Sequence, residues 1–124
     1  MKQKPIPPER SISLRLTFRI RRGSEVAFGP GKADLLEFIA QTGSINQAAK
    51  RMGMSYMRAW SLVQTMNRCF MQPLVAAAPG GTGGGGAKLT QAGHQTLSLY
   101  RQVELKANQA TQILRKKIRS QLKS

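Results

Sequence analysis

The fold is decided by residues 44–70, which read SINQAAKRMGMSYMRAWSLVQTMNRCF. Apolar residues at three- and four-residue steps predict two helices in this stretch, one before and one after Gly53. Gly53 can adopt the left-handed backbone conformation that a tight turn between helices demands. Ala49 is small enough for the point where the two helices approach closely, and Ala59 lies inside the second helix. The stretch predicts a helix-turn-helix, although a plain αα-hairpin has the same local pattern.

Polar residues mark the ends of these helices and of the one before them. Ser44 is followed three residues later by Gln47, which is the pattern of a capping box. Ser55 is placed to cap a helix that we expect to run to about Phe70. The preceding helix is predicted to begin at the Gly29-Pro30 pair and to close at Gly43, with an apolar face supplied by Leu35, Leu36, Phe38 and Ile39.

The segments on either side of the helices predict small β elements. Strict alternation of apolar and polar residues from Ile12 to Ile20 predicts a strand with one buried face, and residues 26–28 are expected to return as the second strand of a hairpin. Residues 74–78 and 87–90 predict two further strands, joined by a run that is almost entirely glycine. A strand pair of this kind after a helix-turn-helix is a wing, here residues 74–90.

A long amphipathic helix is predicted from Thr90 onward, because no strong helix breaker follows. Its apolar stripe has little domain left to cover, so we expect it to pack against a second copy of the chain in a homodimer. The residues expected in that dimer interface are Tyr100, Val103, Ala107, Ala110 and Leu114. The last residues, including Arg115 to Lys117, are expected to be too charged to pack and to fray.

The charge balance points to an anionic partner. The chain of 124 residues has 20 Lys and Arg against 5 Asp and Glu, a formal net charge of +15. Nucleic acid and acidic membrane surfaces are the two common partners of such a protein, and charge alone does not choose between them. The sequence has no apolar run long enough to span a membrane and no signal peptide, so we expect a cytoplasmic protein with no membrane partner. Its single cysteine, Cys69, excludes an intramolecular disulfide.

Together, the helix-turn-helix, the wing and the charge favour double-stranded DNA as the partner. In this arrangement the first turn of the third helix enters the major groove, and the residues expected to read bases are Ser55, Tyr56, Met57 and Arg58. The residues expected to contact the DNA backbone are Ser44, Asn46, Lys50, Arg51, Thr82 and Lys88.

Enzymatic and cofactor chemistry find little support. The only histidine, His94, has no cysteine or carboxylate at metal-ligand spacing, so we expect no catalytic residue, no metal site and no cofactor. Asp34 and Glu37 lie one turn apart but fit the electrostatics of a helix start equally well. Gly81 to Gly86 contains the spacing G-x-G-x-x-G, yet no βαβ unit surrounds it and no lysine directly follows its last glycine. We therefore interpret the glycine run as the tip of the wing.

The predicted organisation has three parts. Residues 1–10 form a disordered basic arm, residues 11–90 a winged helix-turn-helix domain with an N-terminal β-hairpin, and residues 91–124 a long dimerisation helix with a basic end. The fold class is mainly α with a small β content. A rival function of another class is a non-specific architectural protein that binds DNA or RNA through its positive charge alone.

The segment G-x-S-Y-x-x-A-W at residues 53–60, paired with G-G-x-G-G-G-G-A at residues 80–87, resembles the N-terminal domain of ModE-type molybdate-responsive regulators. The resemblance spans roughly residues 14–110 and implies a winged-helix dimer that binds a palindromic operator and represses molybdate-transport or related genes. Members of that family sense molybdate through C-terminal oxyanion-binding domains. Because this sequence ends at Ser124, we expect no such domain here. Either the molybdate signal then comes from a separate molybdate-sensing protein, or the protein is a constitutive DNA binder whose regulation lies elsewhere.

Overall fold

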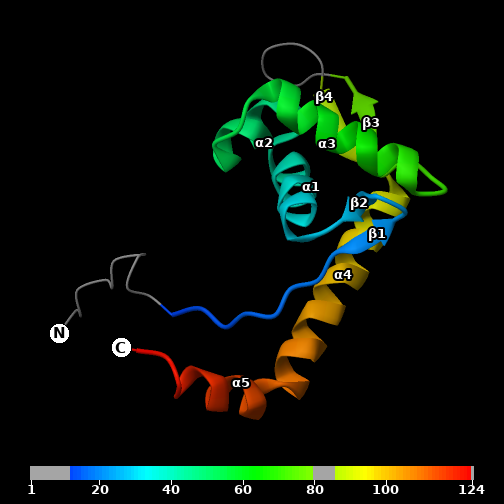
Figure 1. The fold of residues 1–124 in the computed structure, drawn as a ribbon. Coiled ribbons are helices and arrows are strands. Elements are labelled where there is room, and N and C mark those ends of the chain that lie inside the picture. The colour runs from blue at the N-terminus through cyan, green and yellow to red at the C-terminus, as the bar shows by residue number, and fades with distance from the viewer. Residues whose placement is uncertain (1–11, 80–85, 124) are drawn as a thin grey trace.

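The computed structural model describes residues 12–79 and 86–123 of the 124-residue chain. Within these residues the chain forms five helices and two antiparallel two-stranded sheets. In chain order the elements are β1 (Ile20–Arg22), β2 (Glu25–Phe28), α1 (Pro30–Thr42), α2 (Ile45–Met52), α3 (Tyr56–Cys69), β3 (Val75–Ala78), β4 (Gly86–Leu89), α4 (Gln91–Ala110) and α5 (Gln112–Arg119). Figure 1 shows α1, α2 and α3 grouped at one end, while α4 runs away from them toward α5.

The core lies between the three clustered helices and the strands beside them. The largest side chains that are completely buried come from β2, α1, α3 and the residue before β3, and they are Phe28, Leu35, Leu36, Ile39, Val63, Met66 and Leu74. Most of them are the apolar residues whose helical spacing predicted these elements. Burial of each such side chain contributes about 2 kcal/mol, so this cluster is the main source of the fold's stability.

The hairpin of β3 and β4 packs against both the helical cluster and α4. Its register pairs Val75 with Leu89, and the Ala87 amide donates to the Gly43 carbonyl at 2.9 Å, where α1 ends. At the other end of the hairpin, the Thr90 amide donates to the Leu74 carbonyl at 2.9 Å. A helix-turn-helix followed by such a hairpin is a winged helix-turn-helix, which confirms the predicted fold class.

Gly93 lets α4 approach β3 closely. A Cβ atom added to Gly93 would lie 2.1 Å from the Leu74 carbonyl oxygen, a distance that no side chain tolerates. The Gly93 amide donates to the Thr90 hydroxyl at 3.0 Å, so the same turn of helix carries the N-terminal cap of α4. The junction between the wing and α4 therefore depends on a residue without a side chain.

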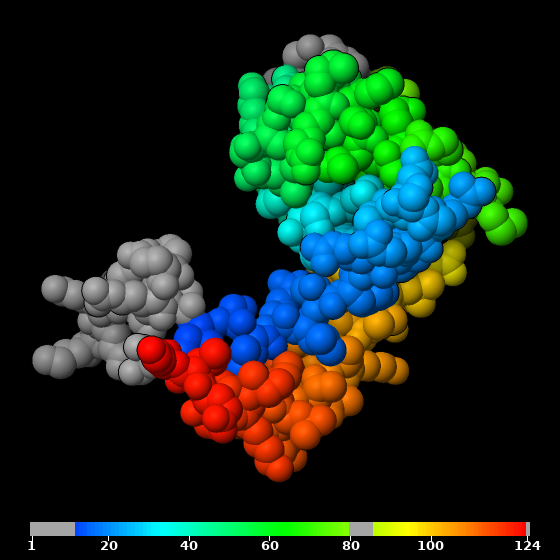
Figure 2. Space-filling view, in the orientation of Figure 1, coloured from blue at the N-terminus to red at the C-terminus, as the bar shows by residue number. Residues whose placement is uncertain are grey.

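The segment before β1 differs from its prediction. Residues 12–20 were expected to form a strand, but only Ile20 lies in β1, and residues 12–19 pair with no other strand in the described chain. The segment instead runs along α4 and α5 (Figures 1 and 2), where helix side chains bond its backbone. These bonds join Tyr100 Oη to the Phe18 carbonyl at 2.7 Å, the Asn108 amide group to Leu16 N–H and C=O at 2.9 Å each, and Arg115 to the Leu14 carbonyl at 3.1 Å.

The alternation correctly predicted an extended backbone in this segment. It did not indicate which element would bond to that backbone. In extended chain, alternate residues present their N–H and C=O groups to the same side. Leu14, Leu16 and Phe18 are alternate residues. Side chains of α4 and α5 bond the carbonyls of all three and the N–H group of Leu16. The place of a neighbouring strand is taken by helix side chains.

The C-terminal helix is broken at Thr111, where one continuous helix was predicted. The Thr111 hydroxyl donates to the Ala107 carbonyl at 2.7 Å, and the Arg115 guanidinium donates to the Asn108 carbonyl. Side-chain donors that compete for helix carbonyls bend a helix, and here α4 and α5 meet at an angle (Figure 1). Arg115 is half-buried in this junction, so the prediction that it frays is wrong.

Some predictions fall outside the described residues. These are the disordered basic arm at residues 1–10, the glycine run at residues 80–85 and Thr82 within it. Among the helices of the described part, none is long and apolar enough to cross a membrane.

Candidate nucleic-acid interface

The turn between α2 and α3 has the geometry that the sequence predicts. Gly53 adopts the left-handed conformation with φ of 68°, and the following Met54 amide donates to the Ala49 carbonyl at 3.0 Å. Ser55 Oγ accepts the Arg58 amide at 3.1 Å and caps α3. These bonds satisfy polar backbone groups within the turn, so α3 begins at a fixed place and angle relative to α2.

The first turn of α3 faces solvent. Ser55, Tyr56, Met57 and Arg58, the four residues expected to read bases, are all exposed, and Met57 is the most open of the apolar ones at 66%. An exposed methionine and tyrosine on one helical turn are unusual for a surface that meets only water, since they leave apolar area unburied. Their role in reading bases stays a prediction.

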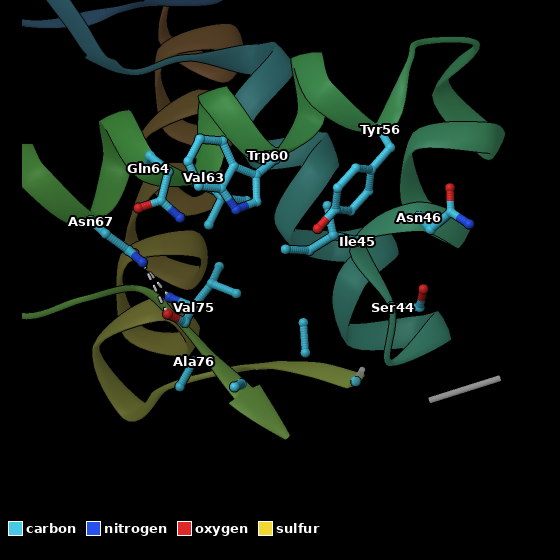
Figure 3. A pocket seen from close by; sticks show the side chains of 13 residues that line it. Ser44, Ile45, Asn46, Tyr56, Trp60, Val63, Gln64, Asn67, Val75 and Ala76 are labelled. Atoms are coloured by element: carbon cyan, nitrogen blue, oxygen red, sulfur yellow. Dashed lines mark hydrogen bonds between the residues drawn. The ribbon is translucent and has the colours of Figure 1, made fainter. Parts of the chain in front are cut away.

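A hollow of about 760 Å³ lies between this end of α3, the start of α2 and the wing (Figure 3). Its wall includes Ser44 and Asn46 from the start of α2, and Tyr56, Trp60 and Gln64 from α3. The side chains that line it carry hydroxyl, amide and aromatic groups but no formal charge. The hollow can therefore offer hydrogen bonds and flat aromatic surface.

Trp60 is the site residue that sequence reasoning missed. No role was predicted for it, but its side chain is 42% exposed and lines the hollow. Figure 3 shows it projecting from α3 on the same side as Tyr56 and Gln64. The signal was present, because Tyr56, Trp60 and Gln64 follow each other at four-residue spacing and so share one helix face.

Asn67 fixes the wing against α3. Its Oδ1 accepts the backbone amides of Leu74 at 2.9 Å and Val75 at 3.2 Å, and its Nδ2 donates to the Val75 carbonyl at 3.1 Å. The dashed bonds in Figure 3 show this amide closing one end of the hollow. One side chain with three hydrogen bonds thus holds α3 and strand β3 together.

Three of the residues predicted to contact the DNA backbone are exposed. Asn46 is exposed and lines the hollow, Lys50 is exposed on α2, and Lys88 is exposed on β4. Asn46 and Lys50 lie on α2 and Lys88 lies on β4, so the three residues come from two elements. Thr82 lies outside the described residues and is not placed relative to the others.

The structure gives two other predicted contacts a local role. Ser44 is only 4% exposed, and its Oγ accepts the Gln47 amide at 3.1 Å as the cap of α2. This confirms the predicted cap and removes Ser44 from the open surface. Arg51 donates to Gln41 Oε1 at 3.0 Å and lies over the Phe38 ring at 6.0 Å, so its guanidinium is tied to α1.

The acidic side chains are gathered into ion pairs elsewhere. Arg101 on α4 donates to Asp34 at 2.8 Å, to Glu37 at 2.8 Å and to Glu104 at 2.9 Å. Burial alone would lower the pKa of Arg101, but its hydrogen bonds to Glu37, Asp34 and Glu104 outweigh this effect and raise the pKa. Asp34 therefore serves the contact of α1 with α4, and it does not stand in the first turn of α1 as the sequence suggested.

Glu25 is the remaining acidic side chain of the described residues. It accepts from Arg68 at 2.6 Å and from the thiol of Cys69 at 3.3 Å. The hydrogen bond from Arg68, and next that from Cys69, lower the pKa of Glu25 below its ordinary value. No carboxylate of the described chain lines the hollow, so nothing there opposes the approach of a phosphate.

The predicted dimer residues divide into two groups. Tyr100 is only 2% exposed because its ring stacks on Phe18 at 4.4 Å and meets Phe28 edge-on at 5.0 Å. It is buried within its own chain, so the expectation that it faces a second copy is corrected. Val103 is half exposed and Leu114 is 62% exposed. Ala107 is partly exposed and Ala110 exposed.

Further apolar residues of α4 and α5 extend this exposed set, namely Leu99, Leu105, Ile113 and Ile118. None of these four residues was among those predicted for the dimer interface. The contact with a second copy stays a prediction.

Comparison with solved structures supports the fold. The DNA-binding domain of CbnR, whose crystal structure is a complex with DNA, matches with a TM-score of 0.56 at 22% identity. The match covers 71% of this chain and 95% of that one.

Curated relatives carry names connected with molybdenum. The chain is 47% identical over 61% of its length to the molybdenum-pterin-binding protein MopB of Rhodobacter capsulatus, covering 28% of that protein. It is 46% identical over 57% of its length to the DNA-binding transcriptional dual regulator ModE of Escherichia coli, covering 27%. It is 35% identical over 85% of its length to the transcriptional regulator ModE of Haemophilus influenzae, covering 40%. The chain thus spans well under half of the length of these relatives.

The predicted resemblance to ModE-type proteins is confirmed by these relatives. A family model also matches residues 32–94, which is half of the chain and includes α2, α3 and the wing, and its description is a bacterial regulatory helix-turn-helix protein of the lysR family. The chain belongs to the lysR family of bacterial regulatory helix-turn-helix proteins.

Proposed function

We propose that this chain is a sequence-specific DNA-binding transcriptional regulator of molybdate-transport or related genes, acting in the cytoplasm. The observation that carries the proposal is the exposed first turn of α3 beside the hollow, on a chain of the lysR regulatory family. The names of two relatives, the molybdenum-pterin-binding protein MopB of Rhodobacter capsulatus and the molybdenum transport protein ModE of Azotobacter vinelandii, support the assignment to molybdate.

In the proposed complex α3 lies in the major groove. Arg58 donates two parallel hydrogen bonds to the O6 and N7 atoms of a guanine, and Met57 contacts a thymine methyl group. Asn46, Lys50 and Lys88 hold phosphates on the strands at either side of the groove, which fixes the register without reading sequence. Trp60 and Tyr56 face the hollow, where their rings would pack on a deoxyribose of the strand that passes between α3 and the wing.

The proposed form is a homodimer on a palindromic operator. A symmetric dimer presents two copies of α3 to successive major grooves about 34 Å apart. The exposed apolar side chains of α4 and α5 support this, because an unburied stripe of that kind favours contact with a second copy. Replacement of Val103 by Glu tests it: sedimentation velocity should show a monomer, whereas Gln102→Glu, with the same charge change on the next residue, should leave the dimer intact.

The experiment that tests the function is competitive binding to the control region of a molybdate-transport operon and to scrambled DNA at physiological salt. We expect a preference of about a thousandfold for the control region.

Arg58→Ala should remove about 10- to 100-fold of this preference, because one bidentate base contact is lost. Lys88→Ala should weaken binding to both DNAs alike and lower the salt dependence by about one phosphate contact. Arg21→Ala, which removes a charge from exposed β1, is the matched control.

The rival function is a non-specific architectural protein, and the same experiment decides between the two. Equal affinity for both DNAs in the wild type, with equal losses in the Arg58→Ala and Lys88→Ala variants, would favour the architectural role and contradict our proposal. The binding is repeated with and without molybdate, and a reporter gene reads the direction of regulation, for which we expect repression.

A further inference from the structure

A second hollow lies at the opposite end of the molecule from α3. It has a volume of about 310 Å³ and lies where segment 12–15 crosses α5. Figure 2 shows this segment, in blue, against the orange and red surface of the C-terminal helices. Its wall includes four cations, namely Arg15, Arg115, Lys116 and Arg119, and two amide side chains, Asn108 and Gln112.

The cations converge because they share one helix face. Gln112, Arg115, Lys116 and Arg119 are separated by steps of three, one and three residues, which place all four side chains on one side of α5. Arg15 approaches from the segment that lies across this face. Like charges so arranged repel each other, and a negative group that binds among them relieves this repulsion.

Arg115 is fixed in this wall. Its guanidinium donates to Thr111 Oγ1 at 3.0 Å, to the Leu14 carbonyl at 3.1 Å and to the Asn108 carbonyl. These partners hold the side chain in place, but they are neutral and leave its charge uncompensated. Within the described residues, no ion pair involves Arg115, Lys116 or Arg119.

Arg15 differs from the other three cations, because it pairs with Glu104 at 3.1 Å. Its side chain is nevertheless 57% exposed. The net charge of the wall is therefore close to that of three cations, which lie on helix α5.

We propose that this hollow is a binding site for a phosphate group, either free inorganic phosphate or a phosphodiester of DNA. Guanidinium and ammonium groups donate to the oxygens of a phosphate from several directions at once, and the amide nitrogens of Gln112 and Asn108 add neutral donors. The site is separate from the interface at α3 and does not depend on the function proposed for it.

The test compares two variants with equal charge. Lys116→Gln/Arg119→Gln removes two cations from the wall of the hollow, while Lys117→Gln/Lys123→Gln removes two from elsewhere in the same C-terminal segment. The Tm of each protein is measured in sodium phosphate and in sodium chloride of the same ionic strength. For a free phosphate site, phosphate at about 20 times its Kd should raise the Tm of wild type and of the control variant by about 5 °C and leave the hollow variant unchanged.

A second measurement distinguishes the source of the phosphate group. The logarithm of the affinity for a 30-base-pair duplex is followed against the logarithm of salt concentration. If the hollow holds a phosphodiester of DNA, the magnitude of the slope should fall by about 1 in the hollow variant and remain near the wild-type value in the control variant. If it holds free phosphate, the two variants should have the same slope and differ in the thermal experiment.

A third measurement needs no substitution. Guanidinium N–H resonances of Arg115 and Arg119 should shift on titration of the wild-type protein with inorganic phosphate or with the duplex, while those of Arg68, which is paired with Glu25, should not. The proposal is overturned if the hollow and control variants behave alike in both the thermal and the salt experiments and no selective shift of Arg115 and Arg119 occurs. That result leaves the operator preference at α3 untouched, so the two proposals fail separately.

Discussion

The cluster of α1, α2 and α3 and the contact of segment 12–19 with α4 and α5 are held together by different chemistry. In the cluster the contacts are apolar, and residues such as Leu35, Leu36 and Met66 are completely buried. The contacts of segment 12–19 with α4 and α5 are mostly polar, because Asn108, Arg115 and Tyr100 donate to its carbonyls. Apolar packing repeats with helix geometry and leaves a period in the sequence, whereas single hydrogen bonds between distant residues leave none.

The largest expected effect is at the close approach that links the two regions. Gly93→Ala places a Cβ atom against the Leu74 carbonyl, so β3 and α4 must separate, and we expect a loss of about 3 kcal/mol in the free energy of unfolding. Chemical denaturation followed by circular dichroism measures it. The control is Gly31→Ala in α1, where the added methyl group meets nothing within 4 Å, and a small gain is expected from helix propensity. Equal effects of the two substitutions would contradict the close approach.

Arg101 should give the next largest effect. Its replacement by Met removes the shared partner of Asp34, Glu37 and Glu104, and the side chain of Glu104 is only 5% exposed. Since Arg101 itself is 26% exposed, we expect a loss of about 2 kcal/mol in the free energy of unfolding, less than for a fully buried pair. Arg68→Met breaks the exposed pair with Glu25 and should have a much smaller effect, because solvent screens that pair. A loss at Arg68 as large as that at Arg101 would refute this ranking.

Asn108 tests whether the crossing segment is held by side chains alone. Asn108→Ala removes both bonds to Leu16, and we expect the amide hydrogen of Leu16 to exchange at least about tenfold faster while the global stability falls by about 1 kcal/mol. Hydrogen exchange followed by NMR reads the two effects separately. Gln109→Ala, at the exposed neighbouring position, should leave the Leu16 exchange rate unchanged.

Tyr100 gives the smallest of these effects and adds a dependence on pH. Tyr100→Phe keeps the ring contacts but loses the bond to the Phe18 carbonyl, for a loss of slightly under 1 kcal/mol at neutral pH. Burial, and next the nearby Glu104, raise the pKa of Tyr100 above its ordinary value. The stability that follows from the raised pKa is present below about pH 10 and is lost as the pH rises through the folded value. Thermal melts should therefore show the advantage of wild type shrinking above about pH 10.

The sequence predicted the parts of the molecule that depend on neighbours in the chain. The caps at Ser44 and Ser55 and the left-handed turn at Gly53 involve residues within a few positions of each other, and all three are confirmed. At the candidate interface, the exposed positions of α3 were likewise readable from helix spacing. The role of Trp60 was missed because an aromatic residue on a helix is usually core, and only its alignment with Tyr56 indicated otherwise.

What the sequence could not show rests on contacts between distant residues. Arg101 reaches Asp34 and Glu37 across 67 and 64 positions, and no local pattern links these charges. At the break near Thr111, Arg115 bonds Leu14, which lies 101 positions away. Helix periodicity continues through this region, so it favoured one unbroken helix.

The bonding of Leu14, Leu16 and Phe18 by helix side chains has a consequence for solubility. An alternating apolar segment with a bare edge is a template on which further chains can add as strands, and such addition leads to aggregates. Here the carbonyls of Leu14, Leu16 and Phe18 and the Leu16 amide are already bonded by Arg115, Asn108 and Tyr100, so these four groups are not open to another strand. The bonds from α4 and α5 thus oppose β-aggregation of the segment that crosses them.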